Sequence, residues 1–207
     1  MSTTTYATAD ERRDAIRVPP VEPRSLFDRL VAWYCRRRFG EVLDNALVLM
    51  HHRKMMSAVF SFEKKVEKWD ALDPDLKTLA QLASASVIGC SWCMDFGFYA
   101  AHSKGLDTSK LAEVPRWRES AAFTAQERRV LEYAEAMTAT PPEVTDEMTE
   151  ALRADLGDQA FVELTMMIAV ENERSRFNSA LGLTSQGFKD RCEIPVTRIG
   201  TSGTSAA

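Results

Sequence analysis

Residues 73–105 read DPDLKTLAQLASASVIGCSWCMDFGFYAAHSKG. The first two residues supply an N-cap and a first-turn proline, and apolar residues then recur at steps of three and four as far as Gly89. A second helix is predicted from Cys90 to Lys104, and the glycine that follows ends it. Two helices separated by one glycine, with no alternating strand pattern, indicate an all-α fold.

The rest of the chain follows the same pattern. Further helices are predicted over residues 26–40, 45–69, 106–114, 124–138, 145–156 and 158–181. We find no strand pattern and no repeat of fixed period. The sequence therefore predicts one all-α domain over 25–195. A flexible, proline-rich N-terminal arm is expected over 1–24, and a flexible tail of small polar residues over 196–207.

Composition and charge exclude several classes of protein. The chain has 207 residues, 26 basic against 30 acidic, and a net charge of −4, so a binder of the nucleic-acid backbone is not expected. No apolar run approaches the roughly 18–20 residues of a membrane span. The N-terminus also lacks the basic and apolar regions of a secretory signal. These features predict a cytoplasmic protein with no membrane partner.

The pair Cys90 and Cys93 carries chemistry that packing does not explain. Cysteines at positions i and i+3 of a helix share one face and can form a disulfide. At a helix N-terminus, free N–H groups and the helix dipole stabilise a thiolate, the nucleophile in disulfide exchange and in attack on peroxides. The dipole favours Cys90 as the attacking sulfur, whereas exposure of Cys93 would favour the other, so both remain candidates.

Zinc binding is the competing interpretation of the pair. A structural zinc site needs four ligands, and the other candidates are scattered through the sequence. They are Cys35, Cys192, His51, His52 and His102. We therefore predict no metal, and we expect Cys35 and Cys192 to be incidental.

Three segments resemble a known family. They are residues 79–106, with LAQLA and GCSWCMD, residues 117–138, which begin WRES, and residues 172–182. Together they resemble the alkyl hydroperoxidase D-like, or carboxymuconolactone decarboxylase-like, family over roughly residues 40–185. The resemblance implies an all-helical homo-oligomer without cofactors. Some members use the Cys-x-x-Cys pair to reduce a hydroperoxide or a partner peroxiredoxin. The pair must then be reduced again by a thiol reductant.

The chain departs from this family at two positions. The peroxidase members carry a Glu twelve residues before the first cysteine and a His seven residues after it, where this sequence has Thr78 and Gly97. Proton relays of this kind contribute roughly 10²–10⁴ in rate, so a weaker peroxidase is expected. A non-catalytic or redox-sensing scaffold and a decarboxylase-like enzyme are the alternative functions.

Other side chains could replace the missing relay. Glu171 interrupts an apolar stripe of the last helix, and an ion pair with Arg174 at a subunit interface is the alternative interpretation. His51 and His52 lie on one predicted helix, where either could neighbour the thiols or simply mark a helix end. Asp95 is expected to be solvated.

Overall fold

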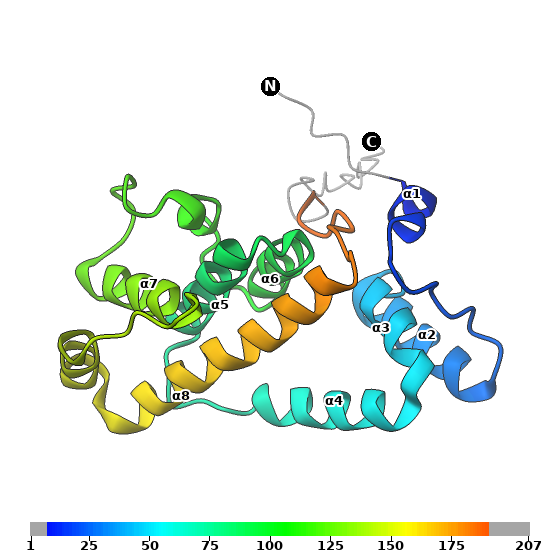
Figure 1. Cartoon of the computed structure of the whole chain (residues 1–207), viewed down its shortest axis with the longest axis horizontal. Coiled ribbons are helices and arrows are strands. Elements are labelled where there is room, and N and C mark those ends of the chain that lie inside the picture. The colour runs from blue at the N-terminus through cyan, green and yellow to red at the C-terminus, as the bar shows by residue number, and fades with distance from the viewer. Residues whose placement is uncertain (1–7, 191–207) are drawn as a thin grey trace, which may run out of the picture.

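The computed structural model describes residues 8–190. Its helices are α1 Ala9–Asp14, α2 Leu26–Phe39, α3 Asp44–Leu49, η1 Met50–His52, α4 Arg53–Val66, α5 Pro74–Ile88, α6 Ser91–Ser103, η2 Leu111–Arg116, α7 Ala125–Thr138 and α8 Asp146–Ala180. No strand occurs within this range, which confirms the predicted all-α class (Figure 1).

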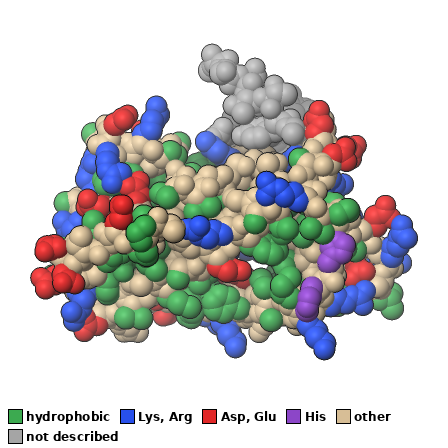
Figure 2. Space-filling view, viewed as in Figure 1, with side chains coloured by type: hydrophobic (Ala, Val, Ile, Leu, Met, Phe, Trp, Pro, Cys, Tyr) green, Lys and Arg blue, Asp and Glu red, His purple; other side chains and the backbone are tan. Residues whose placement is uncertain are grey.

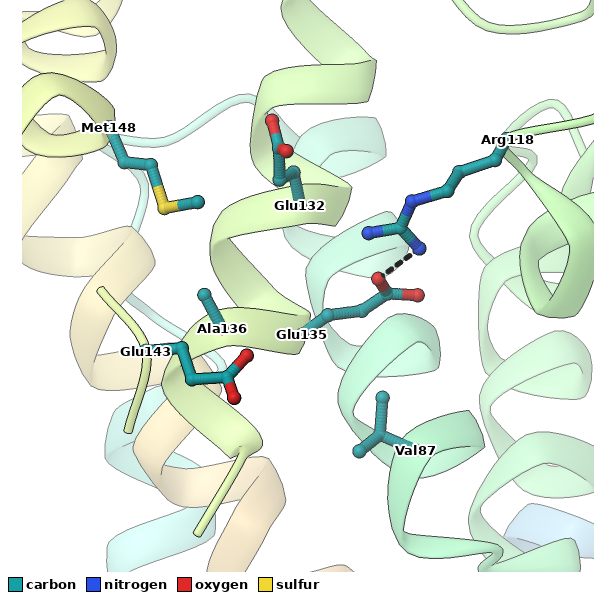
Figure 3. A pocket seen from close by; sticks show the side chains of 7 residues that line it. All are labelled: Val87, Arg118, Glu132, Glu135, Ala136, Glu143 and Met148. Atoms are coloured by element: carbon teal, nitrogen blue, oxygen red, sulfur yellow. Dashed lines mark hydrogen bonds and ion pairs between the residues drawn. The ribbon is translucent and has the colours of Figure 1, made fainter. Parts of the chain in front are cut away.

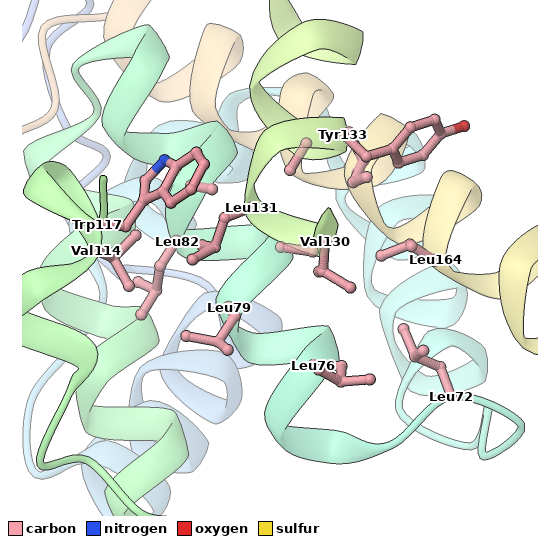
Figure 4. Close-up of a cluster of buried hydrophobic side chains, with 14 of the residues drawn as sticks. Leu72, Leu76, Leu79, Leu82, Val114, Trp117, Val130, Leu131, Tyr133 and Leu164 are labelled. Atoms are coloured by element: carbon pink, nitrogen blue, oxygen red, sulfur yellow. The ribbon is translucent and has the colours of Figure 1, made fainter. Parts of the chain in front are cut away.

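The main core forms around α5. This helix packs against α6, α7, α8 and η2, and Figure 4 shows the leucine and valine side chains that fill the space between them. Leu79, Leu131 and Leu164 are almost completely buried. Each such side chain contributes about 2 kcal/mol of hydrophobic stabilisation. This packing holds α5 in the core, and α6 follows it after two residues.

Two glycines divide helices at the places predicted from the sequence. Gly89 has φ +78°, a left-handed conformation that favours glycine, and it ends α5 so that only two residues separate α5 from α6. Gly157 has φ +77° and ψ 163°, which breaks the helical backbone inside α8. The separate helices predicted over 145–156 and 158–181 correspond to the two sides of this break.

The predicted helix over 45–69 is wrong in its middle. The chain forms α3, a 3₁₀ turn over 50–52, and then α4. His52 has non-helical angles of φ −130° and ψ 81°, and its ring nitrogen Nδ1 accepts the backbone N–H of Met55 at 3.1 Å. The histidine therefore acts as a new N-cap inside what the apolar periodicity presents as one helix.

The predicted helix over 106–114 is also displaced, to a 3₁₀ turn over 111–116. The carboxylate of Asp107 accepts the backbone N–H of Ser109 at 2.8 Å. This side-chain turn competes with a helix start, so the chain becomes helical only after it.

Residues 8–24 are the described part of the segment expected to be a flexible arm. Over 8–24 it forms α1 and then crosses the end of α8, where the Arg17 backbone N–H and guanidinium donate to the carbonyls of Leu181 and Ala180 at 2.9 and 2.5 Å. The carbonyls at the end of a helix lack partners within it, and Arg17 supplies them. The predicted tail over 196–207 and Cys192 lie outside the described residues.

Most of the exposed large apolar side chains of residues 8–190 lie on three helices. α4 buries only Met56 and Val66, and it stands apart from the α5 core in Figure 1. Figure 2 shows hydrophobic side chains gathered along the lower part of this face. The exposed set on α2, α4 and α8 is Leu26, Phe27, Leu30, Trp33, Tyr34, Met55, Phe60, Phe62, Val162 and Met166. Within residues 8–190 no helix has the length and apolar character needed to cross a membrane.

Candidate functional site

The two cysteines lie at the junction of α5 and α6. They form a disulfide, with their Cα atoms 5.3 Å apart. Cys90 is the N-cap of α6, and its Sγ accepts the backbone N–H of Cys93 at 3.2 Å. The structure thus places the pair at a helix N-terminus, as the position of Gly89 predicts, and the first turn of α6 offers an N–H donor to a sulfur.

A side chain of α8 supplies a second donor. Nδ2 of Asn178 donates to Sγ of Cys93 at 3.3 Å, and Asn178 is only 2% exposed. In the sequence Asn178 follows Glu171 on the apolar stripe of the last helix, and its contact with Cys93 was not predicted. A polar residue on that stripe was the available signal. Each sulfur therefore has its own neutral N–H donor.

Apolar side chains cover the sulfurs. Cys90 and Cys93 are 1% and 7% exposed. Their cluster includes Ile16 from the N-terminal segment, Val48 of α3, Ala85 of α5, Trp92 of α6 and Leu183 after α8. A reactant must be small, or these segments must move apart, before it can reach the pair.

The prediction that Asp95 is solvated is wrong. The residue is 6% exposed, and its carboxylate accepts four hydrogen bonds of 2.7 to 3.0 Å. The donors are the hydroxyl of Ser185 and the backbone N–H groups of Gln186, Phe188 and Lys189. These donors satisfy a buried charge that would otherwise be unfavourable, and they fold residues 185–189 over the start of α6.

Trp92 joins the same assembly. Its indole N–H donates to Oε1 of Gln186 at 2.9 Å, and its ring stacks on Phe96 with centroids 4.9 Å apart. The Gln186 oxygen also accepts the backbone N–H of Asp44, at the start of α3. These contacts hold α3, α6 and residues 185–189 together beside the disulfide.

Glu171 lies on the face of α8 that also carries Asn178. It is 5% exposed, and its carboxylate accepts the hydroxyl of Ser175 at 2.7 Å and a guanidinium N–H of Arg174 at 3.4 Å. Burial raises the pKa of Glu171 to about 7, against the opposing effect of Arg174. The ion pair with Arg174 matches the alternative interpretation of this carboxylate. Nε of Arg174 also donates to Oε1 of Glu63 in α4 at 2.8 Å.

The structure does not bring the two adjacent histidines to the cysteine pair. Both side chains are exposed. Nε2 of His51 lies 2.7 Å from the carbonyl oxygen of Pro19, and His52 caps α4. These contacts correspond to the helix-end interpretation of the pair. The apolar periodicity predicted one continuous helix through both histidines. They lie instead in the 3₁₀ turn between α3 and α4.

Thr78 and Gly97, which stand where the family's peroxidases carry relay residues, lie on α5 and α6. The Thr78 hydroxyl donates to the carbonyl of Pro74 at 2.9 Å, within its own helix. A Cβ at Gly97 would lie 2.9 Å from Cδ2 of Leu82, because α6 approaches α5 closely there. A side chain at Gly97 would therefore require the Leu82 side chain to shift.

The remaining candidates do not form a second centre. Cys35 is buried in a separate cluster with Ala32 and Val42, and burial raises the pKa of its thiol. Over the described residues 8–190, no three His, Cys, Asp or Glu side chains are grouped so as to hold a metal ion.

A surface cavity of about 430 Å³ opens elsewhere, at the ends of α5, α7 and α8. Figure 3 shows its lining, in which the ion pair of Arg118 and Glu135 faces Val87. The full lining is Val87, Arg118, Glu132, Glu135, Ala136, Glu143 and Met148. Neither cysteine of the pair contributes to it, so the disulfide site is a separate feature.

Comparison with known proteins gives one family match and several relatives. The model of the carboxymuconolactone decarboxylase family matches residues 53–136. The uncharacterized protein YnjA of Escherichia coli is 35% identical over 182 residues, covering 87% of this chain and 98% of that protein.

Two solved structures have a similar fold over two thirds or more of this chain. A protein of unknown function from Agrobacterium tumefaciens, described as a putative antioxidant defence protein AhpD, has a TM-score of 0.62 and 25% identity, covering 67% of this chain and 94% of its own. The alkylhydroperoxidase AhpD core of an uncharacterized peroxidase-related protein from Ralstonia eutropha has a TM-score of 0.75 and 18% identity, with 87% and 98% covered. The second likeness concerns the fold alone.

Proposed function

The chain belongs to the alkyl hydroperoxidase D-like, or carboxymuconolactone decarboxylase-like, family, and on that premise we propose that it is a thiol–disulfide oxidoreductase. Cys90 and Cys93 would cycle between dithiol and disulfide while reducing a hydroperoxide or the disulfide of a partner such as a peroxiredoxin. One observation carries this proposal: the two sulfurs are bonded at a helix N-terminus, and each accepts an N–H donor.

The chemistry of one turnover balances with two thiols. A thiolate of the pair attacks one oxygen of the hydroperoxide, the O–O bond breaks, and the alcohol leaves after accepting a proton. The sulfenic acid that forms is attacked by the second thiol, so the S–S bond forms and water leaves. Two electrons have passed from the sulfurs to the peroxide, and an external thiol reductant restores the dithiol by disulfide exchange. The cytoplasm would keep such a reductant available.

Peroxide turnover tests this function. The reduced protein is mixed with hydrogen peroxide and an excess of dithiothreitol, and peroxide loss is followed against a protein-free control. Many peroxides consumed per chain are the expected result. A single oxidation without turnover would favour the redox-sensing scaffold, to which Thr78, Gly97 and the covered sulfurs already give some support.

Glu171 is our candidate for the missing proton relay. It lies seven residues before Asn178 on one helix face, about 10 Å along the axis, so a proton would pass by way of the Ser175 hydroxyl and water. We expect Glu171→Gln to lower the rate of peroxide turnover at pH 7 by about 10- to 100-fold and to flatten its pH profile near neutrality. Asn172→Ala, on the same helix, is the control. An unchanged rate and profile in Glu171→Gln would exclude the relay.

The same carboxyl also predicts how stability depends on pH. The pKa of Glu171 rises from 4.5 to about 7 on folding, so the folded chain binds this proton more tightly than the unfolded chain. Its contribution to the free energy of unfolding is complete below pH 4.5 and is lost as pH rises through 7. Between pH 5 and pH 8 we expect the wild type to lose up to about 3 kcal/mol relative to Glu171→Gln. Urea unfolding of both proteins at both pH values measures this difference, and parallel curves would contradict it.

We further propose that the chain forms a homo-oligomer through α2 and α4. Leu26, Leu30 and Trp33 on α2 are 85%, 61% and 60% exposed, and contiguous apolar faces of this kind mark protein interfaces. Trp33→Glu should therefore lower the mass measured by light scattering. Val87→Glu changes an apolar residue that is 48% exposed at the surface cavity, and it should leave the mass unchanged. A monomeric wild type would contradict the proposal.

A further inference from the structure

We infer that Asn178 binds the Cys93 sulfur as a thiolate when the disulfide is reduced, and so sets the thiol pKa and the redox equilibrium of the pair. The inference deepens the proposed function and rests on it for its biological role. In the structure Nδ2 of Asn178 lies 3.3 Å from Sγ of Cys93, and both residues are buried. Asn178 touches a reacting atom, although it takes part in no bond change.

The donor matters most in the reduced state. A disulfide sulfur is a weak hydrogen-bond acceptor, whereas a thiolate carries a full charge, and hydrogen bonds to ionised acceptors are roughly twice as strong. Two electrons and one proton, supplied by a dithiol reductant, break the S–S bond and leave one thiol and one thiolate. Asn178 stabilises the negative charge when it lies on Sγ of Cys93.

The surroundings of Cys93 make this donor important. The side chains packed around the pair are apolar, including Val48, Ala85 and Leu183, and an apolar environment raises the pKa of a thiol. The first-turn N–H of α6 is directed to Cys90 rather than to Cys93. Asn178 therefore provides the side-chain donor that opposes this burial at Cys93.

The charged groups on the neighbouring segments are already engaged. Asp95 on α6 accepts four hydrogen bonds from residues 185–189, and Asp44 on α3 is paired with Arg12. Arg17 on the N-terminal segment donates to the end of α8, and Glu171 bonds to Ser175 and Arg174. We therefore expect removal of the neutral Asn178 amide to change the pKa of the Cys93 thiol.

The backbone holds Asn178 in position. Its carbonyl accepts the backbone N–H of Leu183 at 3.0 Å, which fixes the last turn of α8 against the segment that covers the pair. The amide is therefore preorganised, and forming its hydrogen bond to the sulfur costs little additional side-chain entropy.

Two measurements without any peroxide test the inference. The pKa of Cys93 is read from thiolate ultraviolet absorbance in Cys90→Ser, alone and combined with Asn178→Ala or Asn178→Asp. The dithiol–disulfide equilibrium of the single Asn178 variants is measured in dithiothreitol redox buffers. We expect Asn178→Ala to raise the pKa of Cys93 by about one unit and to lower the equilibrium constant for reduction about tenfold. Asn178→Asp, which has nearly the same shape, should shift both further in the same direction, because its carboxylate repels the thiolate.

A matched control separates this effect from general damage to α8. Asn172 lies on the same helix and donates instead to the Thr138 hydroxyl at 2.8 Å, so Asn172→Ala should leave both quantities unchanged. Circular dichroism establishes that each variant is folded, and the near-isosteric Asp variant remains informative if the Ala variant unfolds. An unchanged pKa and equilibrium in a folded Asn178 variant would overturn the inference. Failure of peroxide turnover alone would instead contradict the proposed function.

Discussion

Replacing Cys90 or Cys93 by serine is expected to lower the rate of peroxide turnover by about a thousandfold or more. The two cysteines act together, so loss of either one should remove most of the catalytic effect. A serine hydroxyl neither attacks the peroxide at neutral pH nor closes a disulfide. Turnover is measured with hydrogen peroxide and dithiothreitol as above.

Cys35→Ser is the control for this experiment. Cys35 is 4% exposed and belongs to a cluster that excludes the pair, so its replacement should preserve turnover. If either Cys90→Ser or Cys93→Ser kept wild-type activity, the cysteine pair would be dispensable. A decarboxylase-like reaction on a small carboxylate would then become the better hypothesis.

Asp95→Ala is expected to cause the largest loss of stability, about 3–5 kcal/mol in the free energy of unfolding. The substitution leaves three backbone N–H groups and one hydroxyl at residues 185–189 without their acceptor. It also releases the segment that holds Gln186 against Trp92. Urea denaturation of the oxidised protein at neutral pH measures the loss.

Asp107→Ala is the matched control for Asp95→Ala. Its exposed carboxylate accepts a backbone N–H from Ser109 at 2.8 Å, and solvent can replace it there. The expected loss is clearly smaller than that of Asp95→Ala. Equal losses in the two variants would show that the contacts of Asp95 with 185–189 contribute little.

Features that depend on local sequence were predictable. The caps at Asp73 and Thr124 and the breaks at Gly89 and Gly157 all act within a few residues, so periodicity and capping chemistry reveal them. The Cys-x-x-Cys pair is likewise a local pattern, and its place at the start of α6 follows from the glycine before it.

Features that depend on distant partners were not predictable. Asp95 takes its donors from residues about 90 positions later, and Arg17 finds its acceptors more than 160 positions away. Neither partner leaves a periodic signal. The contact of Asn178 with Cys93 was not predictable for the same reason, because 85 positions separate the two residues. The sequence shows only that polar residues, Glu171 among them, interrupt the apolar stripe of α8.

The redox activity of the pair is the central claim, and titration with peroxide tests it most directly. The protein is fully reduced, freed of reductant and mixed with one equivalent of hydrogen peroxide, and the peptides are then mapped by mass spectrometry after alkylation. We predict loss of two thiols per chain and a disulfide joining Cys90 to Cys93, which dithiothreitol reverses. If both cysteines are instead recovered as free thiols, and no disulfide between them forms under mild oxidation, the pair is not redox-active and the proposed function is wrong.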